Sequence, residues 1–114
     1  MHELQHKILE FAAARDWERF HNPKDLALSI AIEAAELLEV FQWKNQEEEL
    51  SEADKQSIAS ELADICHYML LLCAKTDIDL EAAIRTKLEV NELRFPVASS
   101  KGIARPVDQN KANG

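Results

Sequence analysis

Very few residues in this chain can interrupt a helix. Among its 114 residues there are two glycines and three prolines, and both glycines lie at or beyond position 102. Apolar side chains recur at intervals of three and four residues, as at Leu4, Ile8 and Phe11. No segment shows the alternation that is typical of a half-buried strand. The sequence therefore predicts an all-α protein.

Capping residues divide this pattern into segments. The first helix is expected from about residue 3 to residue 20. Asn22 followed by Pro23 is typical of a helix start, and the second helix is expected to continue to about residue 44. Glutamates dominate the connector that follows it, which predicts a short solvent-exposed loop.

Two further helices are expected after this connector. Ser51 with Asp54 three residues later resembles a capping box, and the helix that it opens should end near residue 76. Asp79 is expected to cap a fourth helix, which stops before the next proline. These segments predict a four-helix bundle domain at residues 1–96. Residues 97–114 are expected to form a flexible or partner-contacting tail, because they lack apolar periodicity.

The second helix is apolar on almost every side. A helix of this kind needs several neighbours to cover it, and a subunit of four helices rarely encloses one of its own completely. We therefore expect a homo-oligomer, at least a dimer.

The charge of the chain narrows the choice of partners. The net charge is −8, from 21 acidic and 13 basic residues, so neither nucleic acid nor an anionic membrane is an expected partner. Charged residues interrupt the N-terminal segment where a secretory signal would be apolar. The longest apolar stretch, residues 65–74, is too short to span a bilayer. A cytoplasmic protein is expected.

Two acidic motifs lie in helical segments that contain no lysine or arginine: E-A-A-E at 33–36 and E-L-A-D at 61–64. Within each motif the two acids are about 60° apart around the helix axis and one turn apart along it. If the second and third helices pack antiparallel, the two pairs face each other. Four carboxylates suit a hard cation such as Mg²⁺, with Mn²⁺ as a substitute. The candidate ligands are Glu33, Glu36, Glu61 and Asp64.

The alternative interpretation is that these acids are only the solvated faces of their helices. It leaves unexplained why no cation lies within four residues of any of them, since like charges at this spacing repel one another. Spacing alone leaves both interpretations open.

The fourth helix presents a polar face of Lys87, Asn91 and Arg94. Two cations and an amide at positions i, i+4 and i+7 suit phosphate oxygens. The alternative is a basic last turn that complements the helix dipole.

A few aromatic side chains could border a pocket for a planar base, although packing in the core or at an interface is the usual role of such residues. They are Trp17, Phe20, Trp43 and Tyr68.

The spacing E-x-x-E, then 24 residues, then E-x-x-D resembles the metal motif of the MazG-like family of all-α nucleoside triphosphate pyrophosphohydrolases. Three further segments look like the single-domain dCTP pyrophosphatase branch of that family. They are R-D-W-E-R-F-H at 15–21, F-Q-W-K at 41–44, and the run from Lys87 through Asn91 to R-F-P at 94–96. The resemblance covers about residues 5–96.

The resemblance implies Mg²⁺-dependent hydrolysis of a nucleoside triphosphate to the monophosphate and pyrophosphate. The substrate expected first is dCTP or a modified cytosine deoxynucleotide. The resemblance implies that the four acids bind the metal and that a carboxylate accepts the proton of the attacking water, for which Glu36 and then Glu33 are the candidates. It also implies a dimer or a homotetramer built from two dimers. The implied nucleotide contacts are Trp17, Trp43, Tyr68, Lys87, Asn91 and Arg94.

The chain departs from the family pattern in two places. Related dCTP pyrophosphatases have a histidine on the first helix near the base, but this register falls on Ile8 here. His6, two residues earlier, is then the candidate for the base contact. The C-terminal motif of the family is retained only as K-G at 101–102 followed by Arg105. The preferred base therefore stays open.

Two other classes of protein compete with this interpretation. Asp64 followed by His67 three residues later resembles half of the carboxylate and histidine ligand set of a di-iron helical bundle. A non-catalytic helical adapter, whose acids only face solvent, is the other alternative.

Overall fold

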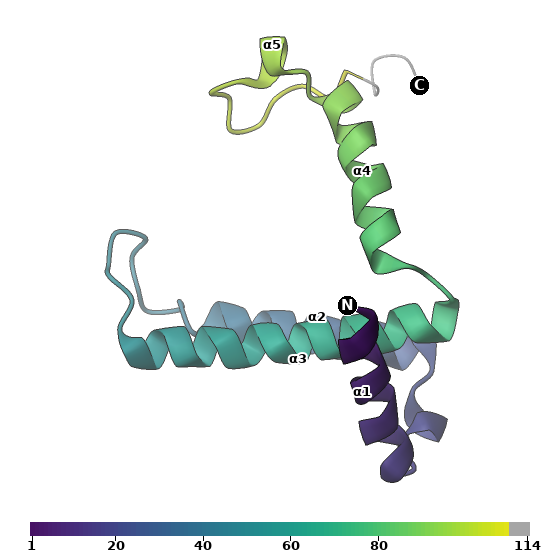
Figure 1. The fold of residues 1–114 in the computed structure, drawn as a ribbon. Helices are drawn as coiled ribbons and strands as arrows, with labels where there is room; N and C mark the ends of the chain where they lie inside the picture. Colours follow the sequence, from purple (N-terminus) through teal and green to yellow (C-terminus); the bar gives the residue numbers. More distant parts are fainter. Residues whose placement is uncertain (110–114) are drawn as a thin grey trace. The chain divides into compact units, whose positions relative to one another are not determined.

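The computed structural model describes residues 1–109, and all regular secondary structure in that range is helical (Figure 1). The described residues form two compact units, which divide after Ile78. The first contains α1 (His2–Ala14), the 3₁₀ turn η1 (Glu18–Phe20), α2 (Pro23–Glu39) and α3 (Glu52–Thr76). The second contains α4 (Leu80–Arg94) and α5 (Val97–Ser100). The all-α prediction is confirmed, while the domain boundary expected after residue 96 stays a prediction.

The helices begin where the capping residues predict. The side chain of Asn22 accepts a hydrogen bond from the N–H of Asp25 at the start of α2. Ser51 and Asp54 exchange two hydrogen bonds of 3.0 Å and so form the predicted capping box of α3. Asp79 caps α4 through its carboxylate. These local bonds satisfy N–H groups that the first helical turn leaves without partners.

The first helix is shorter than predicted, because α1 ends at Ala14 instead of near Phe20. Asp16 has a left-handed backbone conformation, with φ of 53°. The N–H groups of Asp16 and Trp17 donate to carbonyl groups in the last turn of α1. This is a Schellman-type helix end, which glycine usually makes. Aspartate can adopt the same conformation, so the end had no recognisable signal.

The second helix also ends earlier than predicted, at Glu39 instead of near Lys44. The N–H groups of Val40, Phe41 and Gln42 donate to carbonyl groups three residues back, not four. The chain thus passes from the helix into successive tight turns. Lys44 then forms an ion pair with Asp54 at the start of α3, with 3.3 Å between nitrogen and oxygen.

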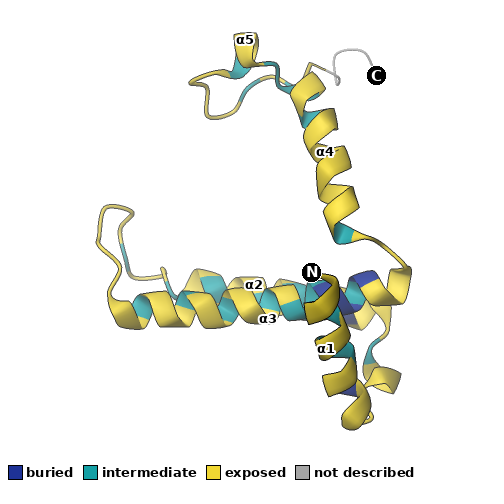
Figure 2. Ribbon diagram, in the orientation of Figure 1, coloured by how far each residue is buried: buried dark blue, intermediate teal, exposed yellow. Residues whose placement is uncertain are grey.

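Helices α2 and α3 lie side by side and run in opposite directions, since one connector joins them at a shared end (Figure 1). Leu26 of α2 and Leu71 of α3 are both 1% exposed. Helix α1 packs against α3, and the side-chain amide of Gln5 donates to the Leu70 carbonyl group over 3.0 Å. Figure 2 shows the buried segments of this unit gathered near that crossing. The pairing of α2 with α3 places the two acidic motifs on adjacent helices.

By length and composition alone, α3 is long and apolar enough to cross a membrane. The expectation that the longest apolar stretch is too short considered only residues 65–74, which are part of this helix. Its contacts point to a different role. It packs against both α2 and α1 and carries Glu61 and Asp64 near its middle. Carboxylates near the middle of a helix are costly in a bilayer, so length and composition alone are weak evidence that α3 spans a membrane.

In the second unit, the segment after α5 makes a hydrogen bond to the end of α4. Helix α4 ends at Arg94, directly before Phe95 and the proline that was predicted to stop it. The segment predicted as a flexible tail contains α5 and then returns to α4, where the Gln109 N–H donates to the Arg94 carbonyl group. Residues 110–114 of that predicted tail lie outside the described residues.

Candidate metal and nucleotide site

Three of the four predicted acids converge. Glu33 of α2 and Glu61 and Asp64 of α3 each offer a carboxylate oxygen, and these oxygens all lie within 4.8 Å of one another. Glu33 and Glu61 are half-buried, whereas Asp64 is exposed. The antiparallel pairing of α2 and α3 produces this group, as the spacing of the motifs predicts.

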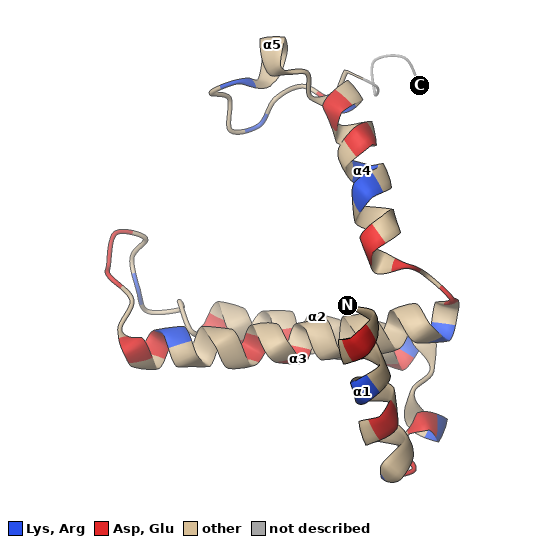
Figure 3. Ribbon diagram, viewed as in Figure 1, with Lys and Arg blue, Asp and Glu red and all other residues tan. Residues whose placement is uncertain are grey.

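Two of these three carboxyl groups each have an oxygen without a hydrogen-bond donor among the described residues. Oε2 of Glu33 and Oε2 of Glu61 are buried, and neither has a partner among the described residues. Figure 3 shows no lysine or arginine in the middle of α2 or α3, and none of the ion pairs within residues 1–109 includes these acids. A buried carboxylate oxygen without a donor or cation is costly. The all-oxygen donor set fits a hard divalent cation.

The site raises the pKa of one of its carboxyl groups. Burial raises the pKa of Glu33 from its ordinary value of 4.5 to about 7, helped by the carboxyl groups of Glu36 and Glu61, which can accept a hydrogen bond only from its protonated form. The negative charges of Glu36 and Asp64 act in the same direction. The metal-free site therefore resists carrying its full negative charge at neutral pH.

We expect the metal-free protein to lose stability as the pH rises from about 4.5 to about 7. Glu33 ionises near its ordinary pKa of 4.5 in the unfolded chain but only near 7 in the folded protein. Between these values the unfolded state binds fewer protons than the folded state, so a rising pH favours unfolding. Urea unfolding in a chelator across this range measures the effect. Glu33→Gln should flatten the slope, and an unchanged slope in this variant would contradict the assignment.

Glu36 occupies a different place from the other acids. It is exposed and lies outside the group of three oxygens, yet it is close enough to Glu33 to raise the pKa of that carboxyl group. Its carboxylate thus adjoins the site from the solvent side.

Aromatic rings from α1, the turn after it and α3 pack against one another. Trp17 packs edge-on against Phe11 with 5.7 Å between ring centroids, because the Schellman-type end of α1 turns the chain back. The His67 ring lies 6.2 Å from Phe11 and 5.7 Å from Tyr68. Burial and then the charge of His21 lower the pKa of His67, which Asp64 opposes.

A pocket of about 290 Å³ opens beside these rings. Its lining residues are Leu4, Lys7, Ile8, Phe11 and His67. Phe11 and His67 were not among the predicted nucleotide contacts. The apolar spacing of Leu4, Ile8 and Phe11, and the position of His67 one turn after Asp64, were the signals that could have identified them.

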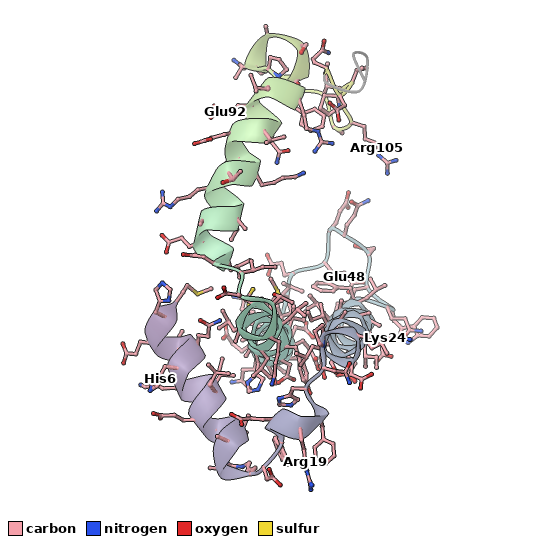
Figure 4. The ribbon with its side chains drawn as sticks, turned by 90° about the vertical axis from the view of Figure 1, so that its right-hand side faces the viewer. His6, Arg19, Lys24, Glu48, Glu92 and Arg105 are labelled. Atoms are coloured by element: carbon pink, nitrogen blue, oxygen red, sulfur yellow. The ribbon has the colours of Figure 1, made fainter. Side chains whose placement is uncertain are left out.

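Two predicted contacts lie away from this pocket. Trp43 is 88% exposed in the turns that follow α2. His6 lies 2.8 Å from a carboxylate oxygen of Glu10, and Figure 4 shows it on the side of α1 turned away from α3. Ile8 lines the pocket in its place.

The predicted polar face belongs to the second unit. Lys87 is exposed on α4, and the Arg94 Nη1 donates to Oδ1 of Asn91 over 3.2 Å. Arg94 also forms an ion pair with Asp108, at 2.7 Å. Hydrogen bonds and an ion pair therefore connect Arg94 with Asn91 and Asp108 at the C-terminal end of this face.

The ligand set of a di-iron bundle does not form around Asp64. Within residues 1–109 the group of side chains that could hold a metal contains three acids and no histidine. The spacing of Asp64 and His67 also recurs at Glu3 and His6 and at Glu18 and His21. The pattern is therefore a weak signal in this chain.

Comparisons with known proteins find similar chains. The model of the MazG-like family matches residues 28–109. The chain is 39% identical over 108 residues to dCTP pyrophosphatase 1 of Bos taurus and 34% identical over 109 residues to that of Homo sapiens. These matches cover 91% and 92% of this chain, and the chain spans 64% of the length of either relative.

A solved structure is also similar. A pyrophosphatase from Archaeoglobus fulgidus superposes with a TM-score of 0.75 and is 38% identical, with 84% of this chain and 92% of that chain covered.

Proposed function

The chain belongs to the MazG-like family, and on this basis we propose that it is a pyrophosphohydrolase that converts a nucleoside triphosphate to the monophosphate and pyrophosphate. The observation that carries the proposal is the convergence of carboxylate oxygens from Glu33, Glu61 and Asp64, together with a buried oxygen on both Glu33 and Glu61 that has no donor among the described residues. The likeness to dCTP pyrophosphatases and to an archaeal pyrophosphatase supports the same activity.

The cofactor that we propose is Mg²⁺, with Mn²⁺ as a substitute. Glu33, Glu61 and Asp64 would hold the cation, with Glu36 as a fourth acid beside them. When bound, a divalent cation polarises the triphosphate and offsets its charge. The protein would supply the carboxylate oxygens, which come from the adjacent helices α2 and α3.

We propose Glu36 as the group that accepts the proton of the attacking water, with Glu33 as the alternative. Glu36 adjoins the site but lies outside the group of three oxygens, so its carboxylate is available for proton transfer. Attack on the α-phosphorus would break its bond to the bridging oxygen and release pyrophosphate.

Substrate contacts are proposed for two groups of residues. Trp17 and Tyr68, which belong to the group of packed aromatic rings, would border the base and sugar, together with Trp43 and His6. Lys87 and Arg94 would offset charge on the departing pyrophosphate, and Asn91 would bind a phosphate oxygen.

We also propose a homo-oligomer, either a dimer or a homotetramer, of four-helix bundle subunits in the cytoplasm. Leu28, Ile32 and Leu38 of α2 are 52%, 57% and 70% exposed within one chain. Such a surface is expected to be covered in solution. Sedimentation equilibrium measures the assembly directly, and the mass of a single chain would contradict this proposal.

We expect dCTP and 5-substituted cytosine deoxynucleotides to be the preferred substrates among canonical and modified triphosphates. Release of pyrophosphate with Mg²⁺ present is the measurement, and detection of the monophosphate distinguishes it from release of single phosphates. Glu61→Gln protein purified in the same way controls for contaminating phosphatases. Equal kcat/KM for all bases would contradict the cytosine preference, and inorganic phosphate as the only phosphorus-containing leaving group would contradict the reaction.

A further inference from the structure

The last described residues of the chain return to the end of α4. The carboxylate of Asp108 accepts a hydrogen bond from Arg94 Nε, with 2.7 Å between Nε and Oδ2. The Gln109 N–H donates to the Arg94 carbonyl group over 2.8 Å. The side chains of Arg94 and Asp108 are only 27% and 12% exposed. An ion pair of this kind is more shielded from water than an ordinary surface pair.

These contacts fix the direction of the guanidinium group. Its Nη1 donates to Asn91 Oδ1 over 3.2 Å, and its central carbon lies 4.9 Å from the ring centroid of Phe95. Within residues 1–109, Nη2 makes no hydrogen bond. A planar guanidinium held by a carboxylate at Nε can still present its outer N–H groups to a second acceptor. The outer N–H groups of the Arg94 guanidinium can therefore donate to an anion.

We propose that Asp108 is a positioning residue that holds the Arg94 guanidinium in the orientation that binds the phosphate oxygens of the substrate. This inference rests on the proposed function, because it requires Arg94 to bind the triphosphate. An arginine without such a partner samples many rotamers and loses this freedom when it binds. Asp108 removes part of that cost before the substrate arrives, without touching the substrate.

The sign of the expected effect separates this role from simple charge repulsion. Asp108 adds a negative charge near a group that binds an anion, so long-range electrostatics alone predicts tighter binding once it is removed. Loss of a positioning contact predicts weaker binding. The two effects move KM in opposite directions.

Asp108→Ala is expected to raise KM for the nucleoside triphosphate about fivefold, the size expected for one side chain that must be immobilised. We expect kcat to change by less than about twofold, because Asp108 does not take part in the chemical step. Asp108→Asn should restore part of the affinity, since its amide oxygen still accepts the Nε–H. The matched control is Glu92→Ala, which removes the same charge from the exposed side of α4 (Figure 4) and should leave KM unchanged or slightly lower.

A double-mutant cycle with Arg94→Ala tests the connection between the two residues. In that background Asp108→Ala should have no further effect on KM, whereas a role in folding of the tail would persist there and lower the melting temperature. An unchanged or lowered KM in Asp108→Ala alone overturns the inference. So does an increase that is equally large in the absence of Arg94.

The same variants separate failure of this inference from failure of the proposed function. If Arg94→Ala raises KM while Asp108→Ala does not, only the positioning role is wrong. If Arg94→Ala leaves KM unchanged, its proposed phosphate contact is wrong, and the inference falls with it. Absence of pyrophosphate release by the unmodified protein would overturn both.

Discussion

Glu61→Gln is expected to lower the rate of pyrophosphate release by about 10³-fold, the scale of losing a central electrostatic contact in an active site. Glutamine keeps the shape of the side chain but removes the charge that the buried Oε2 brings to the group of three acids. Helical content should be unchanged, because Glu61 forms no ion pair within residues 1–109. Steady-state assays and circular dichroism measure the two properties.

Two companion variants make this result specific. Glu39→Gln, an exposed substitution on the same helix as Glu33, should retain full activity. Glu36→Gln should lose turnover but keep its affinity for the cation, because Glu36 lies outside the group of three oxygens. Full activity in Glu61→Gln would contradict the proposed site. Loss of cation binding in Glu36→Gln would instead assign Glu36 to the ligands.

Removal of divalent cations is expected to reduce activity to the level of Glu61→Gln, and addition of Mg²⁺ or Mn²⁺ should restore it. The reason is the unmet charge of Glu33, Glu61 and Asp64, which no lysine or arginine within the described residues neutralises. A cation that binds only the folded state also stabilises it, by about 2.7 kcal/mol when its free concentration is 100-fold above Kd. The melting temperature should therefore rise with Mg²⁺.

The stabilisation by Mg²⁺ should disappear in Glu61→Gln and remain in Glu39→Gln. Calcium at the same concentration provides a second comparison, because it prefers more ligands at longer distances than Mg²⁺. Activity that persists after exhaustive chelation, or an equal thermal shift in both variants, would contradict the metal site.

Local signals in the sequence account for much of the fold. Asn22, Ser51 and Asp79 begin their helices as predicted, because a cap needs only a side chain and a backbone N–H three residues away. The pairing of the acidic motifs was also predictable. It follows from helical periodicity and from the expectation that consecutive helices in a bundle pack antiparallel.

Other features depend on conformations or contacts that no short pattern encodes. The end of α1 relies on a left-handed aspartate, Asp16, at a position where glycine is the usual signal. The pocket beside the aromatic rings joins Phe11 and His67, which are far apart in the sequence. The pairing of Arg94 with Asp108 likewise crosses 14 residues. The exposed position of Glu36, in contrast to Glu33 on the same helix, reflects how α2 packs on α3.

Anomalous diffraction from crystals grown with Mn²⁺ tests the central claim most directly, since it locates the cation independently of activity. We expect a peak bounded by carboxylate oxygens of Glu33, Glu61 and Asp64, at about 2.0–2.3 Å as for a small hard cation. Peaks found only at other acids, with these three carboxylates directed into solvent, would contradict it.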